Sequence, residues 1–283
     1  MTELTTVIND LVPYDIYLAA LARAGRPRGL PFVEFLWDNY AHLEPSRVLD
    51  MLAPLGRRVA FHVMWSRFLD IEDDELDDYL RLVRGHVRAM NPVYVSEHAA
   101  TFRVGNVHLL AATELDWDDQ IDRICERVDR YQNAIGTQLL LENYGSMDER
   151  GRHQLEHLAT IADRTGCGFL FDISNAVMAE LNGVAPFEPW LQLLAGRREL
   201  RCHVGGHSLD PRLGVYEDSH AVALSERTLD ALERTLRTLD VASVCFERAY
   251  NLDAIEMGND MARVLTTIEK VHADVQRAQA RCG

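Results

Sequence analysis

Six short apolar runs of this sequence each lead directly into a residue that can bind a metal ion. The residues in these positions are His62, His98, Glu142, Asp172, His203 and Glu247. Three imidazoles and three carboxylates buried together cost on the order of several kcal/mol for each unpaired charge, and bound cations are the simplest compensation. Mixed imidazole and carboxylate ligation suits iron, manganese or zinc. The pattern predicts a metal centre, provided that the fold brings the six side chains together.

Further candidate ligands follow His203 along the chain. His207 comes after two glycines, which allow a close approach of the backbone. Asp218 and His220 stand at i and i+2, so in an extended loop their side chains point the same way and could chelate one ion. The same pair could instead belong to the segment that caps a helix near Ser225, and the spacing leaves both readings open. Since there are more ligands than one ion needs, two or three ions are expected.

The apolar runs also predict the fold. They are the expected strands Phe32–Leu36, Val59–Met64, Val93–Ser96, Gln138–Leu141, Gly168–Phe171, Leu200–Val204 and Ser243–Phe246, with a weaker first strand near Thr5–Leu11. Segments with helical periodicity, such as Ile71–Met90, separate them, and this alternation is typical of a parallel sheet with crossover helices. The 283 residues therefore predict a single (β/α)8 TIM barrel over residues 1–283. Because all strands of a barrel end at one face, the six strand-end residues would share one pocket.

An open doubly wound sheet is the alternative fold, but the Gly-x-Gly-x-x-Gly motif that it often carries is missing. The remaining histidines fall on expected helices or loops and are interpreted as surface or structural residues: His42, His86, His108, His153, His157 and His272. Met257 and Met261 lie on the expected buried side of the last helix and are interpreted as core residues rather than ligands.

Composition narrows the class of function. The formal net charge of −15 argues against a nucleic-acid partner, because phosphate contacts need a basic face. The single lysine, Lys270, falls in an expected surface helix and no P-loop motif occurs, so Schiff-base and P-loop chemistry are not expected. Five cysteines without a Cys-x-x-Cys pair indicate a reducing compartment. With no signal peptide and no apolar stretch of about 18 residues, we expect a cytoplasmic protein without membrane spans.

Several segments form a joint pattern that extends over nearly the whole chain. They are Val33–Asn39, Ala60–Met64, Pro92–His98, Leu141–Tyr144, Leu170–Ala176, His203–Gly206, Pro211–Arg212, Asp218–His220 and Glu247–Arg248. In this pattern the chain resembles the multinuclear non-heme iron-dependent oxidative enzymes, which modify ribosomally made peptides. Within that family it is most similar to the iron enzyme of methanobactin biosynthesis, which modifies cysteines of a precursor peptide. It departs from that enzyme at His207, where the methanobactin enzyme has an aromatic residue and the wider family has histidine.

The resemblance implies two or three irons, in mixed ferrous and ferric states, near the mouth of the barrel. It assigns His62, His98 and Glu142 to one iron, Asp172, His203 and Glu247 to a second with Glu142 bridging, and Asn175, Asp218 and His220 to a third. His207 is a further candidate ligand. The expected catalytic residues are Glu142, Asp218 and His220, together with Asn143 and Arg248, which with Ser96 are candidates for orienting the ligands.

The implied reaction is an oxidation of a precursor-peptide cysteine by O2. Its outcome is an oxazolone beside a thioamide, as in methanobactin, or another cysteine oxidation such as excision of the β-carbon. The implied partners are the precursor peptide and a small leader-peptide-binding protein. The main alternative is a divalent-metal sugar isomerase or epimerase of the xylose-isomerase-like barrels. A trinuclear-zinc endonuclease, which needs a basic groove, and a non-catalytic metal-storage or peptide-binding module are the others.

Overall fold

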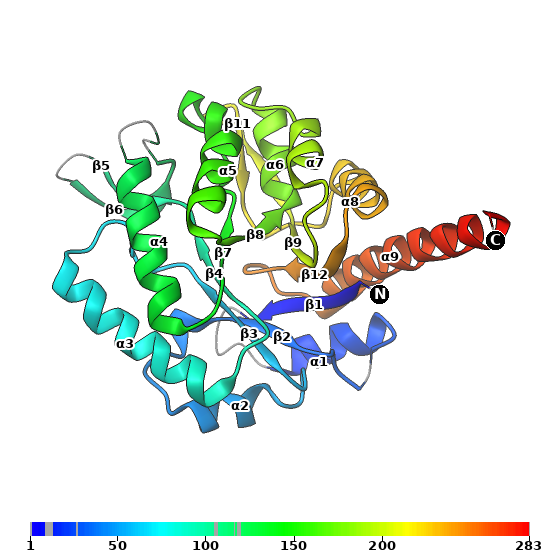
Figure 1. The fold of residues 1–283 in the computed structure, drawn as a ribbon. Helices are drawn as coiled ribbons and strands as arrows, with labels where there is room; N and C mark the ends of the chain where they lie inside the picture. Colours follow the sequence, from blue (N-terminus) through cyan, green and yellow to red (C-terminus); the bar gives the residue numbers. More distant parts are fainter. Residues whose placement is uncertain are drawn as a thin grey trace.

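The computed structural model describes residues 2–8, 14–26, 28–104, 107–115, 117 and 120–282, and among these residues eight parallel strands close into a barrel. Their order around the barrel is β1-β12-β9-β8-β7-β4-β3-β2 (Figure 1). The bounds are β1 (Glu3–Ile8), β2 (Val33–Leu36), β3 (Val59–Val63), β4 (Val95–His98), β7 (Leu139–Glu142), β8 (Gly168–Asp172), β9 (Leu200–Gly205) and β12 (Val241–Glu247). The predicted TIM barrel is confirmed, with helices around the outside of the strands.

Most strands reach further toward their C-terminal ends than the apolar runs indicate. β4, β7, β8 and β12 end on the candidate ligands themselves, and two further candidates, His62 and His203, lie inside β3 and β9. An apolar run stops at its first polar residue, whereas the backbone ladder continues through it, so several expected strand ends fall short. The first strand, β1, begins at Glu3, before the expected start at Thr5. Residues 9–11 of this expected strand lie outside the described residues.

Helices follow the strands in the alternation that a barrel requires. They are α1 (Tyr14–Arg23), α2 (Pro45–Leu52), α3 (Asp73–Met90), α4 (Ile121–Ile135), α5 (Gln154–Thr165), α6 (Ile173–Leu181), α7 (Glu188–Leu194), α8 (Glu226–Thr238) and α9 (Ala254–Cys282). Two 3-10 turns, η1 (Trp37–Asn39) and η2 (Glu149–His153), precede α2 and α5. The C-terminal part of α9 extends beyond the body of the barrel (Figure 1). In the described part of the chain, no helix combines the length and the apolar character needed to cross a membrane.

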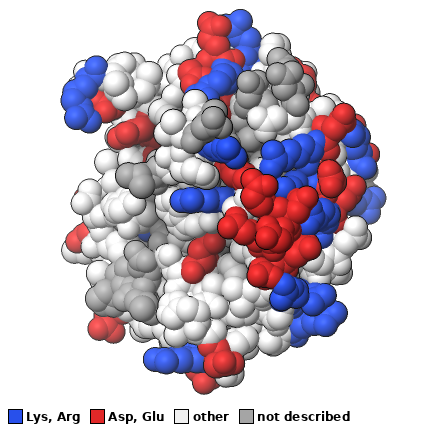
Figure 2. All heavy atoms as spheres, turned by 90° about the vertical axis from the view of Figure 1, so that its left-hand side faces the viewer, with Lys and Arg blue, Asp and Glu red and all other residues white. Residues whose placement is uncertain are grey.

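The helix expected at Ile71–Met90 is α3, which begins at Asp73 and buries the face that carries Leu76. Acidic residues fill its first turn, where they favour the positive end of the helix dipole. Arg130 of α4 pairs with Asp73 at 2.6 Å and with Asp77 at 2.8 Å. Figure 2 shows acidic side chains gathered beside basic ones on the side of the molecule where α3 and α4 lie. The charged side chains on this face are therefore interpreted as solvent-exposed residues of α3 and α4 that form ion pairs with one another.

Two hairpins interrupt the alternation and were not predicted. β5 (Thr101–Val104) and β6 (Val107–Thr113) follow β4, and β10 (His207–Asp210) and β11 (Val215–Asp218) follow β9. Each hairpin replaces a short strand-to-helix connection, so each extends from the face at which the barrel strands end (Figure 1). The second hairpin places His207 opposite Asp218 in its antiparallel register.

The barrel interior has an apolar floor beneath the strand-end residues. Phe32, Ala60, Tyr94, Leu140 and Leu170 form this cluster. Around it, the main core fills the space between strands and helices, and it includes the buried methionines of α9, as predicted. The exposed Lys270 of α9 pairs with Glu233 of α8 at 2.7 Å, which confirms the surface position expected for the single lysine.

Candidate metal centre

The six strand-end residues meet in one buried cluster at the C-terminal face of the barrel. Within it, ligand atoms of His62, His98 and Glu142 lie within 4.8 Å of one another, and so do those of Glu142, Asp172, His203 and Glu247. Five of the six side chains are buried and that of His98 is half-buried. Residues that lie more than 180 positions apart thus share one pocket because parallel strands in register end at the same level.

Glu142 stands between the two groups of ligands. Its Oε2 atom lies 3.4 Å from Nε2 of His62 and 3.3 Å from Nε2 of His98. Its Oε1 atom lies 3.3 Å from Nδ1 of His203, which in turn lies 3.1 Å from Oε1 of Glu247. Each oxygen of one carboxylate therefore faces a different set of imidazoles, which is the arrangement that a ligand shared by two ions needs.

The tautomers of His62 and His98 follow from their hydrogen bonds. Ser96 donates its hydroxyl hydrogen to the carbonyl oxygen of Phe61, so it accepts from Nδ1 of His62 at 3.0 Å. Nδ1 of His98 lies 3.3 Å from the carbonyl oxygen of Val63, which can only accept. Both rings therefore carry their hydrogen on Nδ1 and present the Nε2 lone pair to Glu142, as a metal ligand must.

Several buried polar atoms in this region lack a hydrogen-bond partner. They are Glu142 Oε2, Asp172 Oδ2, Asn175 Oδ1, His203 Nδ1 and His220 Nε2. A buried polar atom without a partner costs about 1–3 kcal/mol, so such a concentration needs compensation. Nitrogen and oxygen lone pairs gathered in one pocket are the donor set of divalent or trivalent cations such as iron, manganese or zinc. The residues present fit a metal centre.

Burial dominates the electrostatics of the carboxylates. It raises the pKa of Glu142 well above the usual range and that of Asp172 to about 7. Burial also acts on Glu247, but the adjacent imidazoles of His203 and His220 outweigh it and hold its pKa well below the usual range. Without cations, two acids of the cluster therefore resist ionisation. A bound ion reverses this preference, because its charge favours the carboxylate.

The pKa values of the imidazoles also shift in opposite directions. Burial lowers the pKa of His62 well below its ordinary value and lowers that of His98. Burial also opposes a charge on His203, but the carboxyl groups of Glu247 and Glu34 outweigh it and raise its pKa well above the ordinary value. His62 and His98 are thus held neutral, in the protonation state that binds a metal.

Asp218 and His220 join the cluster through Glu247. Nε2 of His220 lies 2.9 Å from Oδ1 of Asp218 and 3.0 Å from Oε2 of Glu247. His220 adopts a positive φ of 45°, and its ring lies against Gly205, where a Cβ atom would come within 2.6 Å of the ring. The alternative capping role falls to Ser225, which itself accepts a hydrogen bond from Thr228 N at the start of α8. The geometry leaves Asp218 and His220 free to act as ligands.

Asn143 and Asn175 both form hydrogen bonds with Asp172. Asn143 donates to the carbonyl oxygen of Asp172 at 2.9 Å and accepts from its amide at 2.7 Å. The backbone N–H of Asn175 donates to Oδ1 of Asp172 at 2.8 Å, which caps the N-terminus of α6. The other oxygen of Asp172, Oδ2, has no hydrogen-bond partner. The side chain of Asn175 donates to the carbonyl oxygen of Asn143 at 3.0 Å, so its Oδ1 atom stays unpaired. Asn143 therefore positions the candidate ligand Asp172, and Asn175 has a free side-chain oxygen.

His207 and Arg248 stand further from the cluster. The ring of His207 lies 5.8 Å from that of Tyr216 within the second hairpin, and burial lowers its pKa. The guanidinium of Arg248 donates to the carbonyl oxygens of Tyr250 and Asn251 and pairs with Glu256 at 2.8 Å. Arg248 thus holds the loop after β12. In the described residues His207 belongs to none of the groups whose ligand atoms converge.

Glu34 is the member of the site that sequence reasoning missed. It lies inside β2, is completely buried, and groups with His62, His203 and Glu247. The available signal was a single carboxylate within the apolar run Phe32–Leu36. A charged group in a buried strand is costly unless it forms a hydrogen bond or an ion pair, so its presence indicates a buried partner.

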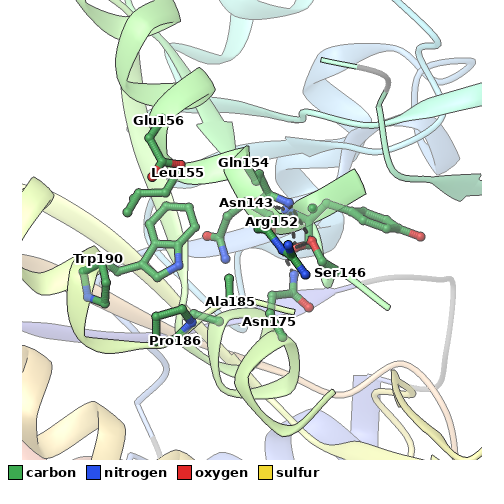
Figure 3. A pocket seen from close by; sticks show the side chains of 15 residues that line it. Asn143, Ser146, Arg152, Gln154, Leu155, Glu156, Asn175, Ala185, Pro186 and Trp190 are labelled. Atoms are coloured by element: carbon green, nitrogen blue, oxygen red, sulfur yellow. Dashed lines mark hydrogen bonds between the residues drawn. The ribbon is translucent and has the colours of Figure 1, made fainter. Parts of the chain in front are cut away.

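A cavity of about 130 Å³ adjoins the cluster on the side of α5, α6 and α7. Figure 3 shows Trp190, Leu155 and Pro186 on one side of it and the polar Asn143 and Ser146 on the other. Asn143 lines this cavity and also donates to the carbonyl oxygen of Asp172, so one wall of the cavity borders the cluster.

Comparison with known proteins gives one family match over most of the chain. Residues 16–271 match the model of a family described as RiPP precursor modification enzyme MbnB/TglH/ChrH, where RiPP denotes a ribosomally made and then modified peptide. A UPF0276 protein of Bordetella bronchiseptica is 27% identical over 265 residues, which cover 90% of this chain and 89% of that protein.

Solved structures share the fold at low sequence identity. An L-ribulose 3-epimerase matches with a TM-score of 0.65 and 14% identity over 99% of both chains. Endonuclease IV from Thermus thermophilus matches with a TM-score of 0.58 and 16% identity, over 95% of this chain and 99% of that one. At these identities the likeness concerns the barrel alone.

Proposed function

The chain belongs to the RiPP precursor modification enzyme family MbnB/TglH/ChrH, and from this premise we propose that it is a di- or tri-iron enzyme that uses O2 to oxidise a cysteine of a precursor peptide. The observation that carries the proposal is the position of Glu142, whose two oxygens face separate sets of imidazoles. A carboxylate placed in this way supports two neighbouring ions rather than one.

In this proposal His62, His98 and Glu142 hold one iron. Glu142, Asp172, His203 and Glu247 hold the second, and Asp218 and His220, with the oxygen of Asn175, hold a third. The iron ions, when bound, supply the dioxygen and one-electron chemistry and a site for the cysteine thiolate. The protein fixes the ligands: Ser96 sets the ring of His62, and Asn143 holds the backbone of Asp172.

The surroundings of the cluster suit a peptide. Large apolar side chains are exposed in the segments that follow the barrel strands, among them Trp65 after β3, Leu213 in the second hairpin and Tyr250 after β12. Apolar groups in such positions favour a partner with apolar side chains over a sugar. A small leader-peptide-binding protein completes the proposed system, since the described chain forms one barrel with two hairpins and shows no separate leader-binding module.

Co-expression with the precursor peptide encoded beside its gene tests the proposal. We expect a mass change in the peptide that requires iron, O2 and an intact cysteine, so a peptide with Cys→Ser serves as the matched control. An unmodified peptide, in the presence of iron, O2 and the neighbouring leader-binding protein, would refute the proposed reaction.

Oxygen uptake separates this reaction from a sugar epimerisation on the same fold. An epimerase needs no O2, so interconversion of ketose sugars at the same rate with and without oxygen would favour the alternative. The proposal expects oxygen uptake only when the precursor peptide is present.

A further inference from the structure

Glu34 is completely buried inside the barrel, one layer beneath the cluster. In the register of β2 and β3, Glu34 is opposite Ala60, whereas the ligand His62 is opposite Leu36, two residues nearer the mouth. Tyr94, from the apolar floor, donates its hydroxyl hydrogen to Oε2 of Glu34. The carboxyl group therefore connects the floor of the barrel to the metal centre above it.

The carboxyl group of Glu34 faces the far side of the His203 ring. Nε2 of His203 lies 3.1 Å from Oε2 of Glu34, as a hydrogen bond, and 2.9 Å from Oε1. The opposite nitrogen, Nδ1, faces Glu142 at 3.3 Å and Glu247 at 3.1 Å. A neutral imidazole has one donor and one acceptor nitrogen. When Nε2 donates to Glu34, the lone pair of Nδ1 is left for a metal.

His203 differs in this from His62 and His98, the two imidazoles proposed for the first iron. His62 and His98 present Nε2 to the cluster, and their Nδ1 atoms are held by neutral acceptors, the hydroxyl of Ser96 and a backbone carbonyl oxygen. His203 presents Nδ1 and is held by a carboxyl group. A carboxylate behind a ligand histidine fixes the ring and makes the nitrogen on the metal side a stronger donor.

We propose that Glu34 is a positioning residue that fixes the tautomer and orientation of His203, with Tyr94 holding Glu34 in place. This inference rests on the proposed function insofar as the cluster binds iron. Glu34 does not serve as a ligand, because both of its oxygens lie against Nε2 of His203 and one also accepts from Tyr94. An ion placed between Glu34 and Nε2 would leave the hydrogen on Nδ1, directed at the metal site.

Anaerobic titration of the apoprotein with Fe2+ tests the assignment in the Glu34→Gln variant. We expect one iron to bind about 10- to 100-fold more weakly than in the wild type. The number of irons bound at saturation should stay the same, and the Mössbauer spectrum of one 57Fe site should change. Glu114→Gln is the matched control: Glu114 is an equally buried carboxyl group that contacts Ser146, Trp117 and Gln154 instead of the cluster, so iron affinity should be unchanged.

Unchanged affinity and spectrum in Glu34→Gln would overturn the positioning role and leave the proposed function intact. A loss of one iron even at saturation would also overturn it, since Glu34 would then be a ligand. A wild-type protein that binds no iron would overturn both. If Glu34→Gln does not fold, Tyr94→Phe carries the test: it keeps the carboxyl group but removes its hydroxyl donor, and should weaken the same site by about 3-fold or more. No change in Tyr94→Phe would then refute the proposal.

Discussion

Replacing Glu142 by Gln should remove the stability that iron confers on the fold. Glu142 contacts His62, His98 and His203, so the substitution takes a charged ligand from both proposed sites while keeping the size of the side chain. Iron at about 100 times its dissociation constant stabilises a protein by about 2.7 kcal/mol per site. For a chain of 283 residues that corresponds to a rise in melting temperature of about 4–5 °C per site.

The assay compares melting temperatures with and without Fe2+ under anaerobic conditions. We expect the wild type and the Glu114→Gln control to show the full rise, and Glu142→Gln to lose most of it together with bound iron. Without iron the variant should melt no lower than the wild type, because burial already raises the pKa of Glu142 and disfavours its charge. An undiminished iron-dependent rise in Glu142→Gln would refute the bridging position.

Two further substitutions test separate parts of the site, and a third tests a buried carboxyl group outside it. Asn143→Ala removes two buried hydrogen bonds to the backbone of Asp172 and should destabilise the protein by about 2 kcal/mol, measured by urea denaturation; a change under about 0.5 kcal/mol would contradict this. Gly205→Ala puts a methyl group within 2.6 Å of the His220 ring and should abolish the third iron while the first two remain, as counted by metal analysis; three retained irons would argue against His220 as a ligand. Burial raises the pKa of Glu114, so above about pH 4 this residue holds its proton more firmly in the folded state than in the unfolded state. Its contribution to stability is therefore lost as the pH rises through the folded pKa, and Glu114→Gln should make this part of the decline smaller in melting curves recorded across pH; an identical slope would count against it.

The barrel and the meeting of the six strand-end residues could be predicted because both depend on a local pattern. A short apolar run followed by His, Asp or Glu needs no knowledge of distant residues, and the topology of a barrel then brings all strand ends together. The family, inferred from the joint pattern of segments, is confirmed by the match over residues 16–271.

Other features depend on contacts that the local sequence does not contain. Glu34 lies within its apolar run and not after it, and its partners His203 and Tyr94 come from β9 and the segment before β4. The two hairpins were missed because the expected barrel alternation joins each strand directly to its helix, although the β5 and β6 segments are rich in apolar and β-branched residues. Arg248 was predicted among the catalytic residues from its place beside Glu247, but its side chain contacts the loop after β12. The catalytic role of Arg248 and the role of His207 as a metal ligand stay predictions.

Iron content of protein purified without oxygen tests the central claim most directly. Metal analysis and Mössbauer spectroscopy of the same sample should find more than one iron per chain, with at least two ions close enough to interact. Stoichiometric zinc alone, with no gain of peptide-modifying activity when ferrous iron is added, would contradict the account.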